Sequence, residues 1–577
     1  MIKKRITYLI QFSALYFFFA TVFFTLILTF SWSWFSPKGW GSISQDALSL
    51  FSALGHLTPK VSLDRWYWFN ERVASFNWQT DFYLHLYMPL FSSIILSFFV
   101  TKVCFKHRKF SNELEFVSGP ELCSGKKATT HANKMQKREL KISNSTIGIK
   151  VHPKLPISTA REQNNFCILG TTGAGKSTIL KPMIKQAIDR NDYAVIYDEK
   201  GEYTQGFYHS FNTVLLAPWD ARSALWDISK DVSSEQDAEL LAQCLIPYSD
   251  TKEEIWNDGA RLILTGMIVS LIYGCKGNWE WHDLYKLLQL SPEHALLRIE
   301  PYYPTVQSLI QKNSKTTQGF YVHLITHLNW LKYLSLAWRN SNKESFSLSQ
   351  WVKSGTSKRV IIIQASSEYE AVGKPLCNTV ISFMTKQYLS SSNHFYRPTW
   401  LFIDEFANLP PNPSVKKWLE LSRAYGGRSV ICTQSLSQIR DIYGEDETNA
   451  ILNLLSNVIT LRLGTAGDDA IFTAQMLSEQ TVEVPNYENA NHIGIRSKQL
   501  LVEASDLTQL RPADNKGVEG YLFIPGWKSV YKLTWPLFTQ PDKAKKFIPA
   551  KWLLEVRVEA SPIIPTPHNK NPLNKWS

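Results

Sequence analysis

Cysteine is scarce in this sequence, and no two cysteines lie close enough to form a ligand pair. The seven are spread from Cys104 to Cys432, and no CxxC motif occurs. The sequence therefore predicts neither a zinc site nor a disulfide framework, and the thiols are expected to be reduced. Charged residues are also few, at 19%, and aromatic residues reach 13%, which excludes a disordered basic tail protein. The net charge of +12 and the pI of about 9.1 favour an anionic partner.

Charge is missing altogether from two apolar runs near the N-terminus. Residues 8–30 and 82–101 contain no charged side chain, and each run is long enough to cross a bilayer as a helix. Basic residues precede the first run and follow the second, so the positive-inside rule places both ends in the cytoplasm. We predict a transmembrane hairpin in residues 1–109, with the tryptophan-rich loop 31–81 outside. A cleaved signal peptide is the alternative for the first run, but no small-x-small cleavage site is visible.

A glycine-rich stretch, Gly170-Thr-Thr-Gly-Ala-Gly-Lys-Ser177, fits the pattern of a phosphate-binding loop. The apolar residues 166–169 predict a buried strand before it, and the spacing of apolar residues over 178–188 predicts a helix after it. Inward-pointing N–H groups and the helix dipole would together cradle a polyphosphate. Lys176 would reach the β- and γ-phosphates of ATP, and the Ser177 hydroxyl would bind Mg²⁺. The expected ATP-binding residues are Gly170, Thr172, Gly173, Ala174, Gly175, Lys176, Ser177 and Thr178.

Strands and helices alternate from residue 166 onward, as in a parallel sheet covered on both faces. The apolar strand 400–403 is followed by Asp404 and Glu405. Paired with the loop upstream, this pattern predicts that Asp404 binds Mg²⁺ and that Glu405 activates the attacking water as general base. Gln434 follows the strand 429–432 and could contact the γ-phosphate or the lytic water. The alternative for Gln434 is a loop amide that faces solvent.

Strand signals stop between residues 233 and 344, where helices are predicted at 234–246, 253–273, 281–290 and 319–336. We predict an all-α domain there, inserted between two parts of an α/β motor domain. Its role is either to grip substrate or to pack as a lid. The remaining predicted boundaries are a basic connector at 110–156, motor-domain parts at 157–232 and 345–545, and a C-terminal tail at 546–577 whose proline-rich end is disordered.

In this order, the features resemble the type IV coupling proteins, the membrane-anchored ATPases of conjugative DNA transfer. The resemblance is carried by the two apolar runs, the phosphate loop, the helical insertion, Asp198-Glu-Lys-Gly-Glu-Tyr203, Asp404-Glu-Phe-Ala-Asn408 and Thr433-Gln-Ser435. It implies a RecA-like P-loop ATPase domain with an inserted all-α domain, carried on a transmembrane hairpin. It also implies ATP and Mg²⁺ as cofactors and a homo-hexamer in the bacterial inner membrane, with most of the chain in the cytoplasm.

The resemblance further implies partners and the roles of two side chains. The hexamer would receive relaxase-bound single-stranded DNA and pass it to the type IV secretion channel. Arg423 matches an arginine that reaches the neighbouring subunit's ATP, and Gln434 matches the family's sensor position. Arg428 competes for the first role, and a surface salt bridge is the alternative function of Arg423.

Other functions remain compatible with these patterns. A docking receptor could recruit relaxase and use ATP mainly for ring assembly, and a coupling ATPase for protein effectors would carry the same motor. A duplex-DNA pump of the chromosome-segregation type usually has more membrane spans and a separate DNA-reading domain, and neither is visible in the sequence.

Overall fold

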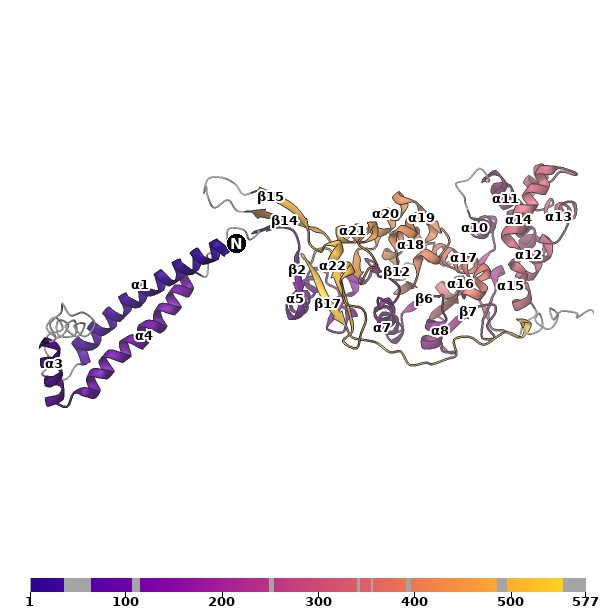
Figure 1. Cartoon of the computed structure of the whole chain (residues 1–577). Coiled ribbons are helices and arrows are strands. Elements are labelled where there is room, and N and C mark those ends of the chain that lie inside the picture. The colour runs from indigo at the N-terminus through magenta and orange to yellow at the C-terminus, as the bar shows by residue number, and fades with distance from the viewer. Residues whose placement is uncertain are drawn as a thin grey trace, which may run out of the picture. The chain divides into compact units, whose positions relative to one another are not determined.

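The computed structural model describes residues 2–35, 64–105, 115–247, 254–339, 343–353, 356–390, 396–484 and 495–553 (Figure 1). The chain divides into two compact units. One comprises Met1–Glu115 and Glu483–Arg496, and the other comprises Phe116–Val482 and Ser497–Ser577. The predicted loop residues 36–63, the basic residues 106–109 and the proline-rich tail from 554 lie outside the described residues.

The N-terminal unit is built on two long helices, α1 (Ile2–Phe35) and α4 (Gln79–Phe105), which pack along each other. A shorter helix, α3 (Asp64–Ser75), precedes α4. A small core of Trp32, Phe69, Val73 and Phe82 joins the three helices. Within α1 and α4, Ile10–Trp34 and Gln79–Cys104 are long and apolar enough to cross a membrane. They overlap the two uncharged runs noted in the sequence, and many of their large apolar side chains are exposed.

The second unit is organised around a ten-stranded sheet with the strand order β2-β17-β16-β13-β5-β12-β11-β6-β10-β7. The seven strands from β13 to β7 are parallel, whereas β16 runs antiparallel to both of its neighbours. Nearly every residue of the parallel strands is buried, because helices cover both faces. Their bounds are β5 (Phe166–Leu169), β6 (Tyr193–Asp198), β7 (Thr213–Leu216), β10 (Val360–Gln364), β11 (Thr399–Ile403), β12 (Gly427–Thr433) and β13 (Asn457–Thr460).

The other strands complete one side of this sheet or form small sheets of their own. The edge of the large sheet is made by β16 (Val518–Phe523), β17 (Ser529–Trp535) and β2 (Glu121–Ser124). The small sheets contain β1 (Glu115–Ser118), β14 (Glu479–Val484), β15 (Ile495–Leu500), β3 (Ile147–His152), β4 (Leu155–Ser158), β8 (Leu225–Trp226) and β9 (Ser345–Phe346).

Helices that follow the strands pack on the sheet and set the position of the loops between them. Among them, α7 contacts β3 and β6, and α18 contacts β12. These helices are α6 (Thr159–Glu162), α7 (Lys176–Asp189), α8 (Glu202–Phe207), α9 (Ile228–Asp231), α16 (Leu348–Lys353), α17 (Glu370–Leu389), α18 (Pro413–Leu421), α19 (Leu436–Tyr443), α20 (Glu445–Leu454), α21 (Asp468–Met476) and α22 (Ala504–Thr508).

Between α9 and β9, the described part of the chain contains six α-helices and one 3₁₀ helix, η2 (Pro304–Ser308), but no strand. They gather at the β7 side of the sheet in Figure 1. Most of α11 is buried among its neighbours, which accounts for its apolar composition although it is also long enough to span a membrane. The helices are α10 (Glu235–Leu245), α11 (Glu254–Gly274), α12 (Trp281–Leu288), α13 (Pro292–Ile299), α14 (Lys315–Leu328) and α15 (Leu331–Trp338).

Two sequence predictions need correction. The helix predicted at 319–336 is two helices, because α14 ends at Leu328 and α15 begins at Leu331. The predicted connector at 110–156 is folded over its described part and contains β1, β2, α5 (Gly125–Ser143) and β3. The sequence pattern of a packed helix was weak over α5, because the side chains that it buries are small or polar and the rest of the helix is basic. The buried residues are Ala128, Ala132 and Gln136.

Candidate functional site

The glycine-rich loop joins β5 to α7 and is tied to the two strands beside β5. The Gly170 N–H donates to the Thr433 carbonyl at 3.3 Å, and the Thr171 N–H donates to the Arg462 carbonyl at 3.1 Å. Gly175 lies in the left-handed region with φ of 98°, and a Cβ there would lie 2.5 Å from a Val518 methyl group. Only glycine fits this position without strain or a clash.

Lys176, the first residue of α7, faces Glu405, which follows β11. The Lys176 Nζ donates to the Gly170 carbonyl at 2.7 Å and lies 4.0 Å from the Glu405 Oε2. Their side chains are only 10% and 6% exposed. Burial lowers the pKa of Lys176 and raises the pKa of Glu405, and in each case the opposite charge of the partner acts against the shift. Each charged group therefore stabilises the other at the carboxyl edge of the sheet.

Asp404 and Ser177, the chain neighbours of Glu405 and Lys176, carry further side-chain oxygen atoms. Asp404 is half-buried, and burial raises its pKa while Lys176 lowers it. Ser177 is the second residue of α7, where backbone N–H groups are free of helical partners. One hydroxyl and one carboxylate suit Mg²⁺, which typically takes few protein ligands together with phosphate oxygens. The described residues contain no group of three or more His, Cys, Asp and Glu side chains that could hold a metal without such phosphates.

Gln434 lies at the tip of β12 and contacts both the loop and the acidic strand end. Its backbone N–H donates to the Glu405 Oε1 at 3.2 Å, and its side-chain Oε1 accepts a hydrogen bond from the Thr172 hydroxyl. The amide is half-buried. The structure thus brings Lys176, Glu405 and Gln434 together, as the shared carboxyl edge of parallel strands predicts.

The two candidate arginines differ sharply in their surroundings. Arg423 lies in a 3₁₀ turn, η5 (Ser422–Tyr425), and its side chain is exposed, with no ion pair to any described residue. Arg428 is buried at the start of β12, and its Nε donates to the Glu162 Oε2 at 2.8 Å. Of these two arginines, only Arg423 is exposed at the surface.

The sequence alone assigned no chemical role to the two acids at the end of β6, Asp198 and Glu199. Asp198 is fully buried, and its Oδ2 accepts hydrogen bonds from the Thr204 N–H at 2.6 Å and the Thr204 hydroxyl at 2.7 Å. Its Oδ1 has no hydrogen-bond partner, and burial raises the pKa of this carboxyl group. The next residue, Glu199, accepts a hydrogen bond from Asn408 at 2.7 Å. These contacts join β6 to the segment that carries Asp404 and Glu405. In the sequence, the motif Asp198–Tyr203 was the feature that could have pointed to these two acids.

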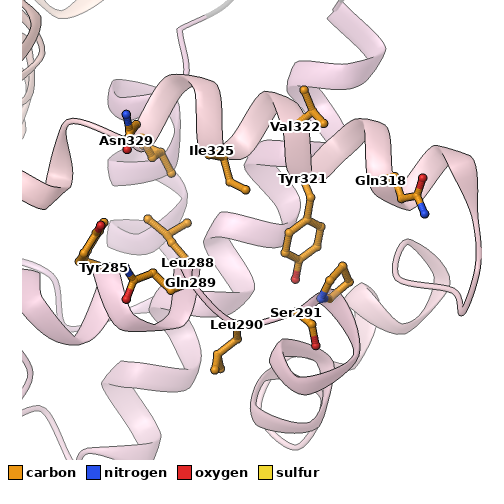
Figure 2. Close-up of a pocket in the computed structure, with 12 residues that line it drawn as sticks. Tyr285, Leu288, Gln289, Leu290, Ser291, Gln318, Tyr321, Val322, Ile325 and Asn329 are labelled. Atoms are coloured by element: carbon orange, nitrogen blue, oxygen red, sulfur yellow. The ribbon is translucent and has the colours of Figure 1, made fainter. Parts of the chain in front are cut away.

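A cavity of about 820 Å³ lies away from this site, among the helices between β8 and β9. Figure 2 shows Tyr285 and Leu288 on one side, Tyr321 and Ile325 on another. None of its lining residues is charged, so it does not suit a polyphosphate. The lining residues are Tyr285, Leu288, Gln289, Leu290, Ser291, Pro292, Gln318, Tyr321, Val322, Ile325, Leu328 and Asn329.

The parallel sheet, the glycine-rich loop and the adjoining acidic strand end define a RecA-like α/β fold. Solved structures share it. The conjugative coupling protein TrwBdeltaN70 in its unbound monoclinic form is 20% identical and gives a TM-score of 0.65, covering 76% of this chain and 97% of that one. TrwB in complex with ADP and Mg²⁺ is 20% identical with a TM-score of 0.64, covering 77% of this chain and 99% of that one.

The sequence comparisons identify the family. The model of the type IV secretion-system coupling protein DNA-binding domain matches residues 150–531, and the chain belongs to this family. It is also 24% identical over 495 residues to the coupling protein TraD of Escherichia coli strain K12. That match covers 84% of this chain and 66% of TraD.

Proposed function

We propose that the protein is a membrane-anchored ATPase that couples a relaxase–DNA complex to a type IV secretion channel and drives single-stranded DNA through it during conjugation. Membership of the coupling-protein family supports the biological role. The observation that carries the chemistry is the buried approach of Lys176 to Glu405, 4.0 Å apart beside the phosphate loop.

In this proposal the loop residues Gly170 to Thr178 bind ATP through their backbone N–H groups. Lys176 exchanges its hydrogen bond with the Gly170 carbonyl for contacts with the β- and γ-phosphates. Glu405 accepts the proton of the attacking water, and Gln434 senses the γ-phosphate through its place between the loop and Glu405. Ser177 and Asp404 would hold Mg²⁺, which neutralises charge that develops on the phosphates.

Arg423 acts in trans on the nucleotide of the next subunit in a homo-hexameric ring. Its guanidinium is exposed and has no ion pair among the described residues, and the neighbouring Leu421 is 53% exposed, which supports an interface at this turn. An arginine that completes a neighbour's site stabilises transition-state charge and is worth roughly 10³–10⁵ in rate. Hydrolysis would then depend on assembly.

The remaining parts of the chain are assigned around this motor. Residues 1–109 form a two-span hairpin in the bacterial inner membrane, with α1 and α4 as the spans and most of the chain in the cytoplasm. The exposed apolar faces of both helices support this assignment. Helices α10 to α15 form an all-α domain inserted between the two parts of the motor. The net charge of +12 supports binding of single-stranded DNA through its phosphates.

The proposal can be tested by measuring the ATPase rate of the full-length protein in detergent, with and without single-stranded DNA, over a range of salt concentrations. We expect DNA to stimulate turnover and salt to weaken that stimulation steeply, because phosphate contacts release counterions. Lys176→Ala should abolish turnover, whereas Glu293→Gln, which changes an exposed acid on α13, should not. Normal DNA transfer by cells that carry only Lys176→Ala would refute the motor and leave a docking receptor for relaxase or protein effectors.

A further inference from the structure

The turn that carries Arg423 is anchored through its backbone, while the exposed Arg423 side chain forms no ion pair with any residue that the structure describes. The Tyr425 carbonyl accepts hydrogen bonds from the Arg397 N–H at 2.9 Å and from the Tyr388 hydroxyl at 2.8 Å. The Gly426 N–H donates back to the Arg423 carbonyl at 3.1 Å. A backbone that is held so closely fixes the direction in which the exposed guanidinium leaves the turn.

Two glycines bring this turn into close contact with its surroundings. Gly426 has φ of 94°, and a Cβ there would lie 2.6 Å from the Arg397 carbonyl oxygen. A Cβ on Gly427 would lie 2.2 Å from the Ser422 Oγ. The turn is therefore packed against the chain before β11 and against its own first residue, and it has little room to shift.

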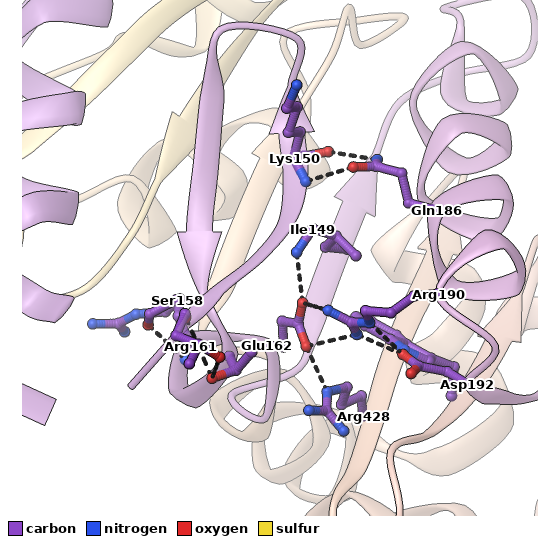
Figure 3. A network of polar contacts seen from close by, with 12 residues as sticks. Ile149, Lys150, Ser158, Arg161, Glu162, Gln186, Arg190, Asp192 and Arg428 are labelled. Atoms are coloured by element: carbon purple, nitrogen blue, oxygen red, sulfur yellow. Dashed lines mark hydrogen bonds and ion pairs between the residues drawn. The ribbon is translucent and has the colours of Figure 1, made fainter. Parts of the chain in front are cut away.

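Arg428 contacts the same turn from inside the protein, and Figure 3 shows its other contact, with Glu162. Its NH1 donates to the Gly426 carbonyl at 2.7 Å, and its Nε donates to Glu162. Glu162 is completely buried and also accepts hydrogen bonds from Arg190 at 2.8 and 3.0 Å and from the Ile149 N–H at 2.6 Å. The carboxylate is thus paired with two arginines, which is the condition for keeping such a charge buried.

Tyr388 supplies the anchor that mutation can test most cleanly. It lies near the end of α17, is 4% exposed, and its hydroxyl also contacts the Arg397 carbonyl at 2.7 Å. Like an ordinary tyrosine, it is protonated and can donate at neutral pH, and burial raises its pKa further, to about 12. Replacement by phenylalanine removes this donor and keeps the ring.

We propose that the Tyr388 hydroxyl and the Glu162–Arg428 ion pair are positioning groups for Arg423, because they fix the backbone of the Ser422–Gly427 turn from which it reaches the neighbouring subunit. The inference rests on the proposed action of Arg423 in trans. It assigns a function to a buried network that lies outside the nucleotide site of its own subunit.

The test uses mixed assemblies of the full-length protein in which each subunit has one role. An Arg423→Ala subunit keeps its own nucleotide site but offers no arginine, so it is the acceptor. A Lys176→Ala subunit hydrolyses nothing but offers Arg423, so it is the donor. Mixing the two should restore ATPase activity, and a failure to restore it would refute the action of Arg423 in trans together with this inference.

The positioning role is then tested by adding Tyr388→Phe to one partner at a time. In the donor it should lower the restored rate at least tenfold, because displacing a catalytic group by about 1 Å can cost up to 10²-fold. In the acceptor it should have little effect. Tyr531→Phe, which changes a buried tyrosine on β17, is the control and should be neutral in the donor.

The remaining outcomes separate this inference from the proposed function. If the Tyr388→Phe donor restores activity as fully as its parent, the positioning role is wrong while the action of Arg423 in trans stands. Equal losses in donor and acceptor would indicate general damage to the fold and would also overturn the inference. Arg428→Lys, which keeps the charge and loses the guanidinium geometry, should repeat the asymmetry of Tyr388→Phe.

Discussion

Gly175 offers a quantitative test of the loop geometry. An alanine there would adopt φ of 98°, which costs about 1–2 kcal/mol for an L-residue. Its Cβ would also lie 2.5 and 2.9 Å from the two methyl groups of Val518, and overpacking of this kind costs about 1–3 kcal/mol. The sum of about 2–5 kcal/mol corresponds to a loss of roughly thirty-fold or more in ATP affinity if the loop must keep this shape to bind.

A double-mutant cycle separates the clash from the backbone strain. Val518→Ala removes both methyl groups, so adding it to Gly175→Ala should recover about 1–3 kcal/mol of binding free energy, measured by calorimetric titration with ATP. Gly173→Ala is the matched control, because Gly173 also has positive φ but its added Cβ would meet no protein atom within 4 Å. Val518→Ala should therefore give Gly173→Ala no recovery. Equal recovery in both backgrounds, or none in either, would refute the steric argument.

Four further outcomes are expected from the same geometry. Glu405→Gln should bind ATP with unchanged affinity yet hydrolyse it at least 10²-fold more slowly in single-turnover assays, and rapid hydrolysis would exclude Glu405 as the general base. Arg423→Ala should abolish hydrolysis in homogeneous rings, and a normal rate by phosphate release would refute its assigned role. Burial raises the pKa of Asp198 in the folded protein, so its contribution to stability is present below the unfolded pKa of about 3.9 and is lost as pH rises through the folded pKa. The free energy of unfolding of Asp198→Asn, measured by chemical denaturation, should accordingly fall less than that of the parent as pH rises above 4, by up to about 1.4 kcal/mol per pH unit, and identical pH profiles would contradict this. Deleting residues 1–108 should leave a soluble ATPase that assembles poorly, and size-exclusion chromatography showing intact rings would oppose a role of the hairpin in assembly.

The parallel strands could be predicted because burial on both faces leaves a direct record in the sequence. The strand 166–169 is an uninterrupted apolar run, and β5 has the same bounds, while the predicted strand 400–403 lies within β11. Helix α17 was not predicted, because its sequence lacks a clear apolar helical pattern: it contains Pro375 and buries polar side chains such as Asn378 and Ser382. The strand order was also hidden, since β5 lies between β12 and β13, which follow it by hundreds of residues.

The part of the candidate site that lies at the ends of parallel strands could be predicted from the topology of the sheet alone. Residues that follow parallel strands meet at one edge, and the structure accordingly brings Lys176, Glu405 and Gln434 together. Contacts between loops could not be predicted from the sequence. The hydrogen bond from Thr172 to Gln434 depends on the exact course of two loops, and sequence spacing does not specify that course.

The choice between Arg423 and Arg428 shows what three-dimensional information adds. In the sequence the two arginines lie five residues apart beside two glycines, and either could extend toward a neighbouring subunit. In the structure, the Arg428 guanidinium donates hydrogen bonds to Glu162 and to the Gly426 carbonyl. Because Glu162 is buried, removing Arg428 would take away one of the cations that balance its charge. Arg423 lies in the same turn with an exposed side chain that forms no ion pair within the described part of the chain. The buried arginine therefore serves the fold, and the exposed one is free to serve a second subunit.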